Sequence, residues 1–337
     1  MEMRWLSDTR QGTSRAASAR EVDEMKTKLM TTILLTALCL LAAPFALEQL
    51  DNLQHVVGKW TRNTFMSSLV TVHASERKAD ENFSAAHNHL VPQTASTSEE
   101  FRWSGRVAEG KTIEVKGING GVRAEPAQGN EVEVIATKTG RRSDPKEVEI
   151  RVVEHGGGVT ICAVYPSPDS SRPNDCVPGE GGNSNVQNND VDVAFRVRVP
   201  RGVRFSGRTV NGGIDAATLG GDVDAKTVNG SININTAGVA RAKTVNGSIT
   251  ASMGRADWSA PLEFKTVNGA INLELPPGTS AEVKAETFNG DINTTFPITA
   301  TGRVGRRHLN GTIGAGGREL SIKTVNGSIS LRGGSER

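Results

Sequence analysis

The chain is dominated by an internal repeat built on the dipeptide Asn-Gly, which occurs eight times. A β-branched aliphatic residue stands three positions after each asparagine, and an apolar residue stands directly before it. Another mostly apolar column lies six positions before the asparagine. Each repeat therefore predicts a short strand, a tight turn and a second short strand. The asparagines are Asn119, Asn211, Asn229, Asn246, Asn268, Asn289, Asn310 and Asn326.

The repeat length is that of one coil of a β-solenoid. From Asn211 onward the spacings are 18, 17, 22, 21, 21 and 16 residues. Stacked coils place equivalent residues about 4.8 Å apart, so identical side chains share one environment. We expect the β-branched column to form the core. We expect the asparagines from Asn211 to Asn326, including Asn310, to line one corner, where stacked amides can hydrogen-bond between coils.

The predicted fold class is therefore all-β: a parallel β-helix or β-solenoid of short strands with Asn-Gly turns, preceded by a β-rich N-terminal region. The alternative is a meander of antiparallel hairpins, because Asn-Gly between alternating strands is also a strong hairpin pattern. The solenoid better explains why one residue type recurs column by column. Both interpretations leave one question open. The threonine two positions before most asparagines is adjacent to an apolar residue, so one of the two must face outward or lie in the bend.

The N-terminal part of the chain has the composition of an export signal and a tether. Residues 25–46 have a lysine-flanked start, an apolar run and small residues at the end, which is typical of a signal peptide. An uncleaved membrane anchor is the alternative, although the run is short for a spanning helix. The predicted organisation is 1–24 untranslated or disordered, 25–46 signal peptide, 47–100 disordered tether, 101–200 N-terminal β region, 201–332 solenoid and 333–337 tail.

The three cysteines predict one disulfide. Cys39 lies within the predicted signal, and the bulky Leu38 before it argues against a lipoprotein. Cys162 and Cys176 then remain as an even pair in an exported chain, where disulfides persist. The segment 165–189 is rich in Pro, Ser, Gly and Asn, so we expect a long loop that the bridge pins to its strand.

The strings KTVNGSI and TVNGGID, together with FRWSGRV and IEVKGINGGVRAE, resemble the bacterial putative-adhesin β-strand-repeat family, a domain of unknown function. The resemblance covers residues 101–332. It implies an adhesin-like, β-helix-like domain of the cell envelope or cell surface. The sequence has no C-terminal sorting motif, later membrane segment or translocator barrel of a typical surface adhesin. We therefore expect a periplasmic or secreted protein, with no stable membrane insertion after signal cleavage.

A basic column stands three positions before the asparagines. Seven of its eight members are basic, and strand alternation would turn them outward. We expect this stripe to bind an anionic polymer such as an acidic glycan or lipopolysaccharide. The alternative is that these side chains only solvate the sheet and oppose edge pairing. The candidate residues are Arg208, Lys226, Lys243, Lys265, Arg307 and Lys323, with Lys116 and Glu286 completing the column.

Other classes of function have little support in the sequence. The net charge of +2 gives no global field for nucleic acid. Carboxylates of the repeats, such as Asp215 and Glu263, fall in different columns, whereas glycosidases need a close pair. We expect no cofactor and no metal: His87 and His89 lie in the polar tether, and the segment 220–224 matches a calcium-binding β-roll motif only once.

Sugar-stacking aromatics are also scarce, with Trp103, Tyr165 and Trp258 the only Trp or Tyr residues after the tether. The sequence therefore predicts a non-enzymatic, adhesin-like β-solenoid of the cell envelope that binds a surface or an anionic polymer through an exposed face. The alternative is a structural scaffold or a scaffold for a protein partner in the envelope, linked to envelope stress.

Overall fold

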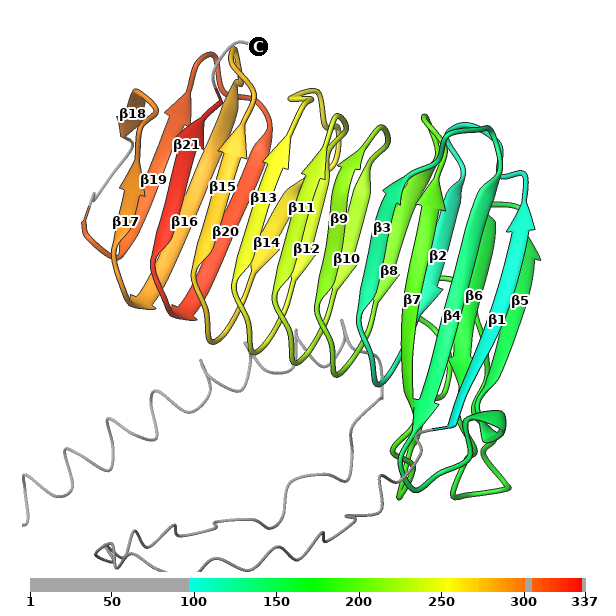
Figure 1. The fold of residues 1–337 in the computed structure, drawn as a ribbon. Helices are drawn as coiled ribbons and strands as arrows, with labels where there is room; N and C mark the ends of the chain where they lie inside the picture. The colour runs from blue at the N-terminus through cyan, green and yellow to red at the C-terminus, as the bar shows by residue number, and fades with distance from the viewer. Residues whose placement is uncertain (1–96, 301–304, 335–337) are drawn as a thin grey trace, which may run out of the picture. The chain divides into compact units, whose positions relative to one another are not determined.

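The computed structural model describes residues 97–300 and 305–334, which form two open β-sheets facing each other across one core (Figure 1). These residues contain 21 strands and one short 3-10 helix, η1 (Pro145–Glu147). None of the described helices is long and apolar enough to cross a membrane. The predicted signal, most of the tether, His87 and His89 lie outside the described residues. The first strand begins at Thr97, so the last four residues assigned to the tether belong to a sheet.

Sheet A has ten strands and sheet B has eleven. In spatial order, sheet A consists of β1 (Thr97–Gly105), β4 (Val132–Gly140), β7 (Asp192–Val199), β3 (Val122–Pro126), β9 (Ile214–Leu219), β11 (Ile232–Thr236), β13 (Ile249–Met253), β15 (Ile271–Leu275), β21 (Ile329–Gly333) and β17 (Ile292–Thr294). Sheet B consists of β18 (Ile298–Ala300), β19 (His308–Ile313), β16 (Ala281–Asn289), β20 (Glu319–Asn326), β14 (Leu262–Lys265), β12 (Ala240–Lys243), β10 (Val223–Lys226), β8 (Arg204–Arg208), β2 (Thr112–Lys116), β6 (Gly158–Val164) and β5 (Glu149–His155).

One rung consists of a sheet-B strand, an Asn-Gly bend and a sheet-A strand. In β10–β11 and β12–β13, for example, Val223 pairs with Ala240 and Ile232 pairs with Ile249, both in parallel register. The solenoid prediction is therefore confirmed. The hairpin alternative is wrong for these rungs, because the two strands beside each bend lie in different sheets. The seven rungs are β2–β3, β8–β9, β10–β11, β12–β13, β14–β15, β16–β17 and β20–β21.

The rungs are not stacked in sequence order. The last rung, β20–β21, pairs with β14–β15 on one side and with β16–β17 on the other. At the opposite end, β2–β3 lies between β6 and β7 on one side and β8–β9 on the other. The predicted N-terminal β region thus continues directly into the repeat region through both sheets.

The asparagine column forms an unbroken ladder of side-chain hydrogen bonds along the bend. Each Nδ2 donates to the Oδ1 of the next asparagine at 2.7–2.9 Å. Backbone bridges between the same residues keep the bends in register. The ladder runs Asn289, Asn326, Asn268, Asn246, Asn229, Asn211, Asn119.

Asn310 is not in this ladder, which corrects the sequence prediction. It lies in β19, which pairs antiparallel with β16, so Lys284 faces Asn310. The glycine that follows it, Gly311, lies in the middle of the strand and not at a bend. A Cβ at Gly311 would overlap the Ile298 side chain. This Asn-Gly pair therefore allows close packing of the β18–β19 hairpin, a known use of glycine within strands.

The threonine column faces inward, which answers the question that the repeat pattern left open. Each threonine Oγ1 donates to the carbonyl of the Asn-Gly glycine in the neighbouring rung, as Thr227 does to Gly212 at 2.8 Å. Thr209, Thr244, Thr266, Thr287 and Thr324 make the equivalent bond at 2.8–2.9 Å. The hydroxyls therefore satisfy backbone acceptors that lie close to the core. The apolar neighbour turns outward at the corner, where Phe288 is 67% exposed.

The ladder makes a prediction about spontaneous deamidation. In this reaction the backbone nitrogen of the following glycine attacks the asparagine Cγ, ammonia leaves, and water opens the resulting succinimide to aspartate or isoaspartate. The Gly120 N–H is held by the Asn211 carbonyl at 2.9 Å. The Gly290 N–H has no backbone acceptor within residues 97–300 and 305–334. We therefore expect Asn289 to deamidate first when the folded protein is kept at pH 8 and 37 °C.

Peptide mapping by mass spectrometry measures this rate. Asn119 is the matched control, because it is the other terminal asparagine of the ladder. In urea, where the fold is lost, Asn119 and Asn289 should react at similar rates. Equal rates in the folded protein would contradict the prediction.

Candidate functional site

The residues three positions before the ladder asparagines form one column on the outer face of sheet B. Strand register places Lys116, Arg208, Lys226, Lys243, Lys265, Lys323 and Glu286 side by side in this order. Adjacent members are about 4.8 Å apart along the sheet. Arg307 does not join the column, because it lies in the exposed turn before β19 and only its backbone carbonyl reaches β16. The prediction that Arg307 belongs to the basic column is therefore wrong. Like Asn310, it belongs to the segment of β19, which pairs antiparallel with β16 and is not part of a rung.

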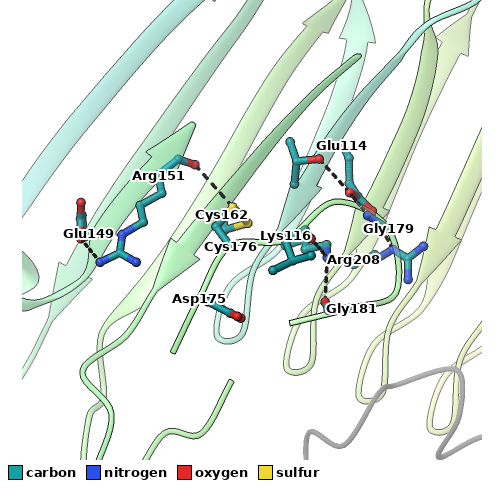
Figure 2. Close-up of a disulfide and its surroundings, with 12 residues drawn as sticks. Glu114, Lys116, Glu149, Arg151, Cys162, Asp175, Cys176, Gly179, Gly181 and Arg208 are labelled. Atoms are coloured by element: carbon teal, nitrogen blue, oxygen red, sulfur yellow. Dashed lines mark hydrogen bonds and ion pairs between the residues drawn. A yellow bond between two sulfur atoms is a disulfide. The ribbon is translucent and has the colours of Figure 1, made fainter. Parts of the chain in front are cut away.

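A disulfide ties a long loop onto the first part of this column. Cys162 on β6 pairs with Lys116 on β2, so the cysteine occupies the next place in the same column. It is bridged to Cys176, with 5.7 Å between the Cα atoms (Figure 2). The bridge therefore holds the loop of residues 165–190 against the outer face of sheet B.

The loop and its neighbours neutralise this first part. The Lys116 Nζ donates to the carbonyls of Val177 and Gly181 at 2.5 and 3.3 Å (Figure 2). Burial lowers the pKa of Lys116, against the opposing effect of the nearby Glu114 carboxylate. The Glu180 carboxylate of the loop contacts Lys226 at 2.5 Å. Burial would raise the pKa of Glu180, but the hydrogen bond and charge of Lys226 hold it below its ordinary value.

Glu114 is the buried centre of this covered region. Its carboxylate contacts the Arg208 guanidinium at 3.0 Å and accepts hydrogen bonds from the Thr160 hydroxyl and the Gly179 N–H at 3.0 and 2.9 Å. A buried charge needs such partners to offset its lost hydration. Arg208 is therefore occupied by Glu114 and is poorly placed to bind a ligand.

The second part of the column is less compensated. Lys243 contacts Glu263 at 2.5 Å and Lys323 contacts Glu286 at 3.2 Å. Lys265 lies between these two lysines, is 8% exposed, and has no ion-pair partner in the part of the chain that the structure describes. Burial lowers the pKa of Lys265, and the charges of Lys243 and Lys323 lower it further against the effect of Glu263. We call Lys243, Lys265 and Lys323 the lysine triad.

A groove of about 530 Å³ crosses the outer face of sheet B beside the column. The loop at Gly179 and the hairpin end at His155 line it, as do the segment from Arg255 to Ser259 and the strands between them. Its charges are mixed: Arg204, Arg208, Arg241 and Arg255 lie among Glu114, Asp222, Asp224 and Asp257. Such a surface selects no net charge, so the groove alone does not indicate a ligand.

Two residues that line the groove, His155 and Glu114, both contact the buried Thr160, but this arrangement does not make a nucleophile. The His155 Nε2 is 3.1 Å from the Thr160 hydroxyl, which donates to Glu114. Thr160 is fully buried and its proton already faces a carboxylate, so it cannot be activated by His155 or reach a substrate. No cluster of three His, Cys, Asp or Glu side chains suitable for a metal occurs among the described residues.

The remaining candidates have structural roles. The segment 220–224 is a bend that leads into β10, and the Asp222 side chain accepts the Val239 N–H at 3.0 Å. Tyr165 and Trp258 are buried, and their polar atoms donate to the carbonyls of Val191 and Glu319. Trp103 packs half-buried against the core. These three aromatics are therefore not open stacking platforms for a sugar.

Residues 207–332 match the model of the Toastrack DUF4097 family. Among solved structures, the chain is similar to a putative cell adhesion protein from Clostridium sporogenes, with 11% identity over 71% of this chain and 100% of the other, and a TM-score of 0.40. It is also similar to a putative adhesin from Bacteroides fragilis, with 9% identity over 70% and 97% of the two chains and a TM-score of 0.23. A putative adhesin from Parabacteroides distasonis has 11% identity over 70% and 97%, with a TM-score of 0.19. No curated protein matches the chain.

Proposed function

We propose that this chain, whose residues 207–332 belong to the Toastrack DUF4097 family, is an exported binding module that holds an anionic polymer on the lysine triad. The observation that carries the proposal is Lys265. Its ammonium group lies between two other lysines and lacks a carboxylate of its own among the described residues. Three ammonium groups against Glu263 and Glu286 leave one positive charge, which a bound phosphate or carboxylate would compensate.

The geometry of the triad favours a polymer over a single small anion. The three ammonium groups come from β12, β14 and β20, which are neighbours in one sheet and present equivalent positions about 4.8 Å apart. A chain with regularly repeated anionic groups can contact all three at once. A single anion would contact one or two of them and gain less.

The Cys162–Cys176 disulfide supports a location outside the cytoplasm, because such bonds persist in oxidising compartments. The proposed site is therefore a periplasmic or secreted one, where acidic glycans and lipopolysaccharide are the anionic polymers at hand. A non-catalytic role is part of the proposal. The buried and already donated hydroxyl of Thr160 supports it.

Removing the triad charges tests this proposal. The variant Lys243→Gln, Lys265→Gln, Lys323→Gln should bind heparin and lipopolysaccharide vesicles at least about tenfold more weakly than the parent, since three charge-assisted contacts are lost. Binding by the parent should weaken as salt rises, because Lys243 and Lys323 are partly exposed and dissolved ions screen their charges. Surface plasmon resonance at low and physiological salt measures both effects.

The matched control removes three exposed charges elsewhere, at Arg141, Lys146 and Arg172, and changes the net charge equally. Unchanged binding by this control would place the site at the triad. Equal losses of binding in the two variants would mean that binding depends on the net charge and not on the position of the lysines, and would contradict the proposal. Salt-independent binding, or none by the folded parent, would favour the scaffold function instead.

A further inference from the structure

Two strand edges are open at the end of the molecule farthest from β17 and β18. Within the described residues, β1 pairs only with β4 in sheet A, and β5 pairs only with β6 in sheet B (Figure 1). These edge strands have 9 and 7 residues, whereas β17 and β18 at the other end have 3 each. Natural sheets normally keep such edges short or covered, because a long one is a template for another strand.

The core is also incompletely covered at this end. Phe101 and Trp103 on β1, and Ile150 and Val152 on β5, pack against the core but stay partly exposed. A solenoid end that leaves apolar side chains half-covered needs a partner or a cap. The features of β1 and β5 therefore point to an occupant that supplies both backbone pairing and apolar surface.

The two edge strands carry the same charge pattern. On β1, Glu100 and Arg102 flank Phe101 on the exposed face, with 2.6 Å between the carboxylate and the guanidinium. On β5, Glu149 and Arg151 flank Ile150, with 2.8 Å between the charged groups. An antiparallel copy of either strand, centred on the middle residue, would place each glutamate opposite an arginine. Opposite charges in such facing positions stabilise strand pairing.

Strand register places Phe101 of β1 and Ile150 of β5 at the same height along the strand direction. In sheet A, Phe101 is level with Val122 through Ala136 and Phe195. In sheet B, Ile150 pairs with Ala163, which is one residue beyond the Lys116–Cys162 pair and therefore level with Gly117. Gly117 and Val122 stand on either side of the first Asn-Gly bend.

These two positions face each other across the core. A ring carbon of Phe195 would lie 3.6 Å from a Cβ on Gly117. One axis perpendicular to both sheets can therefore pass beside Phe101 and Ile150, midway between each residue and its copy in the second chain. Phe101 is also the middle residue of β1, so a two-fold rotation about this axis would pair all nine residues of β1 with those of a second β1.

We infer that a second copy of this chain docks at this end, with β1 pairing antiparallel to β1 and β5 to β5 about one two-fold axis. Sheet A then continues through all nine residues of β1. In sheet B the continuation is short: Glu149–Arg151 of β5 face their own copies, and Val152 lies opposite Val148, just after η1. The rotation brings Phe101 and Ile150 next to their own copies and completes the cover of the core. Such an isologous interface closes on itself and leaves no long edge for further growth.

Cross-linking tests the register. Rotation about Phe101 places Ser98 opposite Ser104 of the second copy, and both side chains are exposed. In a full-length Cys39→Ser background, a mixture of the Ser98→Cys and Ser104→Cys variants should form a disulfide-linked dimer under mild oxidation. Neither variant alone should do so, because its own copies place the two cysteines far apart. Cross-linking of a single variant as strong as that of the mixture, or no cross-linking of the mixture, would overturn the inference.

Charge exchange tests the pairing energetically. Arg102→Glu should raise the dimer dissociation constant by about tenfold or more, because each Glu100 would face a glutamate. The double variant Glu100→Arg, Arg102→Glu should restore dimerisation, since the facing charges are again opposite. Sedimentation velocity of the full chain measures both, and circular dichroism checks that each variant is folded. A monomeric parent at tens of micromolar, or a double variant no better than the single one, would contradict the inference.

Discussion

Replacing Gly247 by alanine is expected to lower the free energy of unfolding by about 3 kcal/mol. Gly247 lies in an Asn-Gly bend in the middle of the ladder, where each bend rests on the next. A Cβ at this position would overlap the backbone carbonyl of Gly230 in the neighbouring rung. Because the obstacle is backbone, no side-chain rotation relieves the overlap, and the rungs must separate locally. Urea unfolding followed by circular dichroism measures the change.

Gly129→Ala is the matched control for this prediction. A Cβ on Gly129 meets open space, and the position needs no left-handed backbone. The free energy of unfolding should then change by about 0.5 kcal/mol or less. If Gly247→Ala were tolerated as well as Gly129→Ala, close contact between bends would not be what requires glycine in the repeat.

Replacing Phe264 by alanine should cost about 4 kcal/mol of stability. The Phe264 side chain is fully buried between the sheets on β14, so its removal exchanges a filled space for a cavity. Rungs contact mainly their neighbours, so the loss should be concentrated around β12, β14 and β20. Hydrogen exchange should accelerate most in these strands and least in β1 and β4.

Phe288→Ala is the same chemical change at an exposed position. Phe288 is 67% exposed at the corner of the β16–β17 rung, and its removal should cost about 0.5 kcal/mol or less. Similar losses for the two phenylalanines would contradict a core that lies between the sheets. A uniform increase in hydrogen exchange after Phe264→Ala would instead indicate that the rungs unfold together.

Much of the fold could be predicted from the repeat, because in a stack of rungs the residue type that suits one rung also suits the rungs on either side of it. A column such as Ile232 and Ile249 must be β-branched to fill the core, and must be identical to nest in successive rungs. The ladder asparagines follow the same logic at the bend. The sequence could not show that Asn310 leaves the column, because the same dipeptide serves a bend in seven rungs and close packing in β19.

The sequence predicts which side chains face outward from sheet B, but it does not predict which of their charges are neutralised. Alternation correctly turned Lys226 and Lys243 away from the core. Their partners come from elsewhere: Glu180 from the disulfide loop and Glu263 from the next strand. The path of a long loop does not follow from its composition, so its neutralising carboxylate was missed. The Glu-x-Arg pattern of β1 is visible in the sequence. That β1 lies at an open edge of sheet A is known only from the strand order in the structure.

The stacking order of the rungs has a consequence for how the chain reaches its native state. Among the seven rungs, β20–β21 is the last in sequence order, yet it lies inside the stack. Until it arrives, β14–β15 and β16–β17 have no contact with each other through their edges. The molecule therefore cannot assemble by adding rungs in order from its N-terminus. The rung β16–β17 can join the stack only through β20–β21, so the native stack requires the last rung of the repeat region.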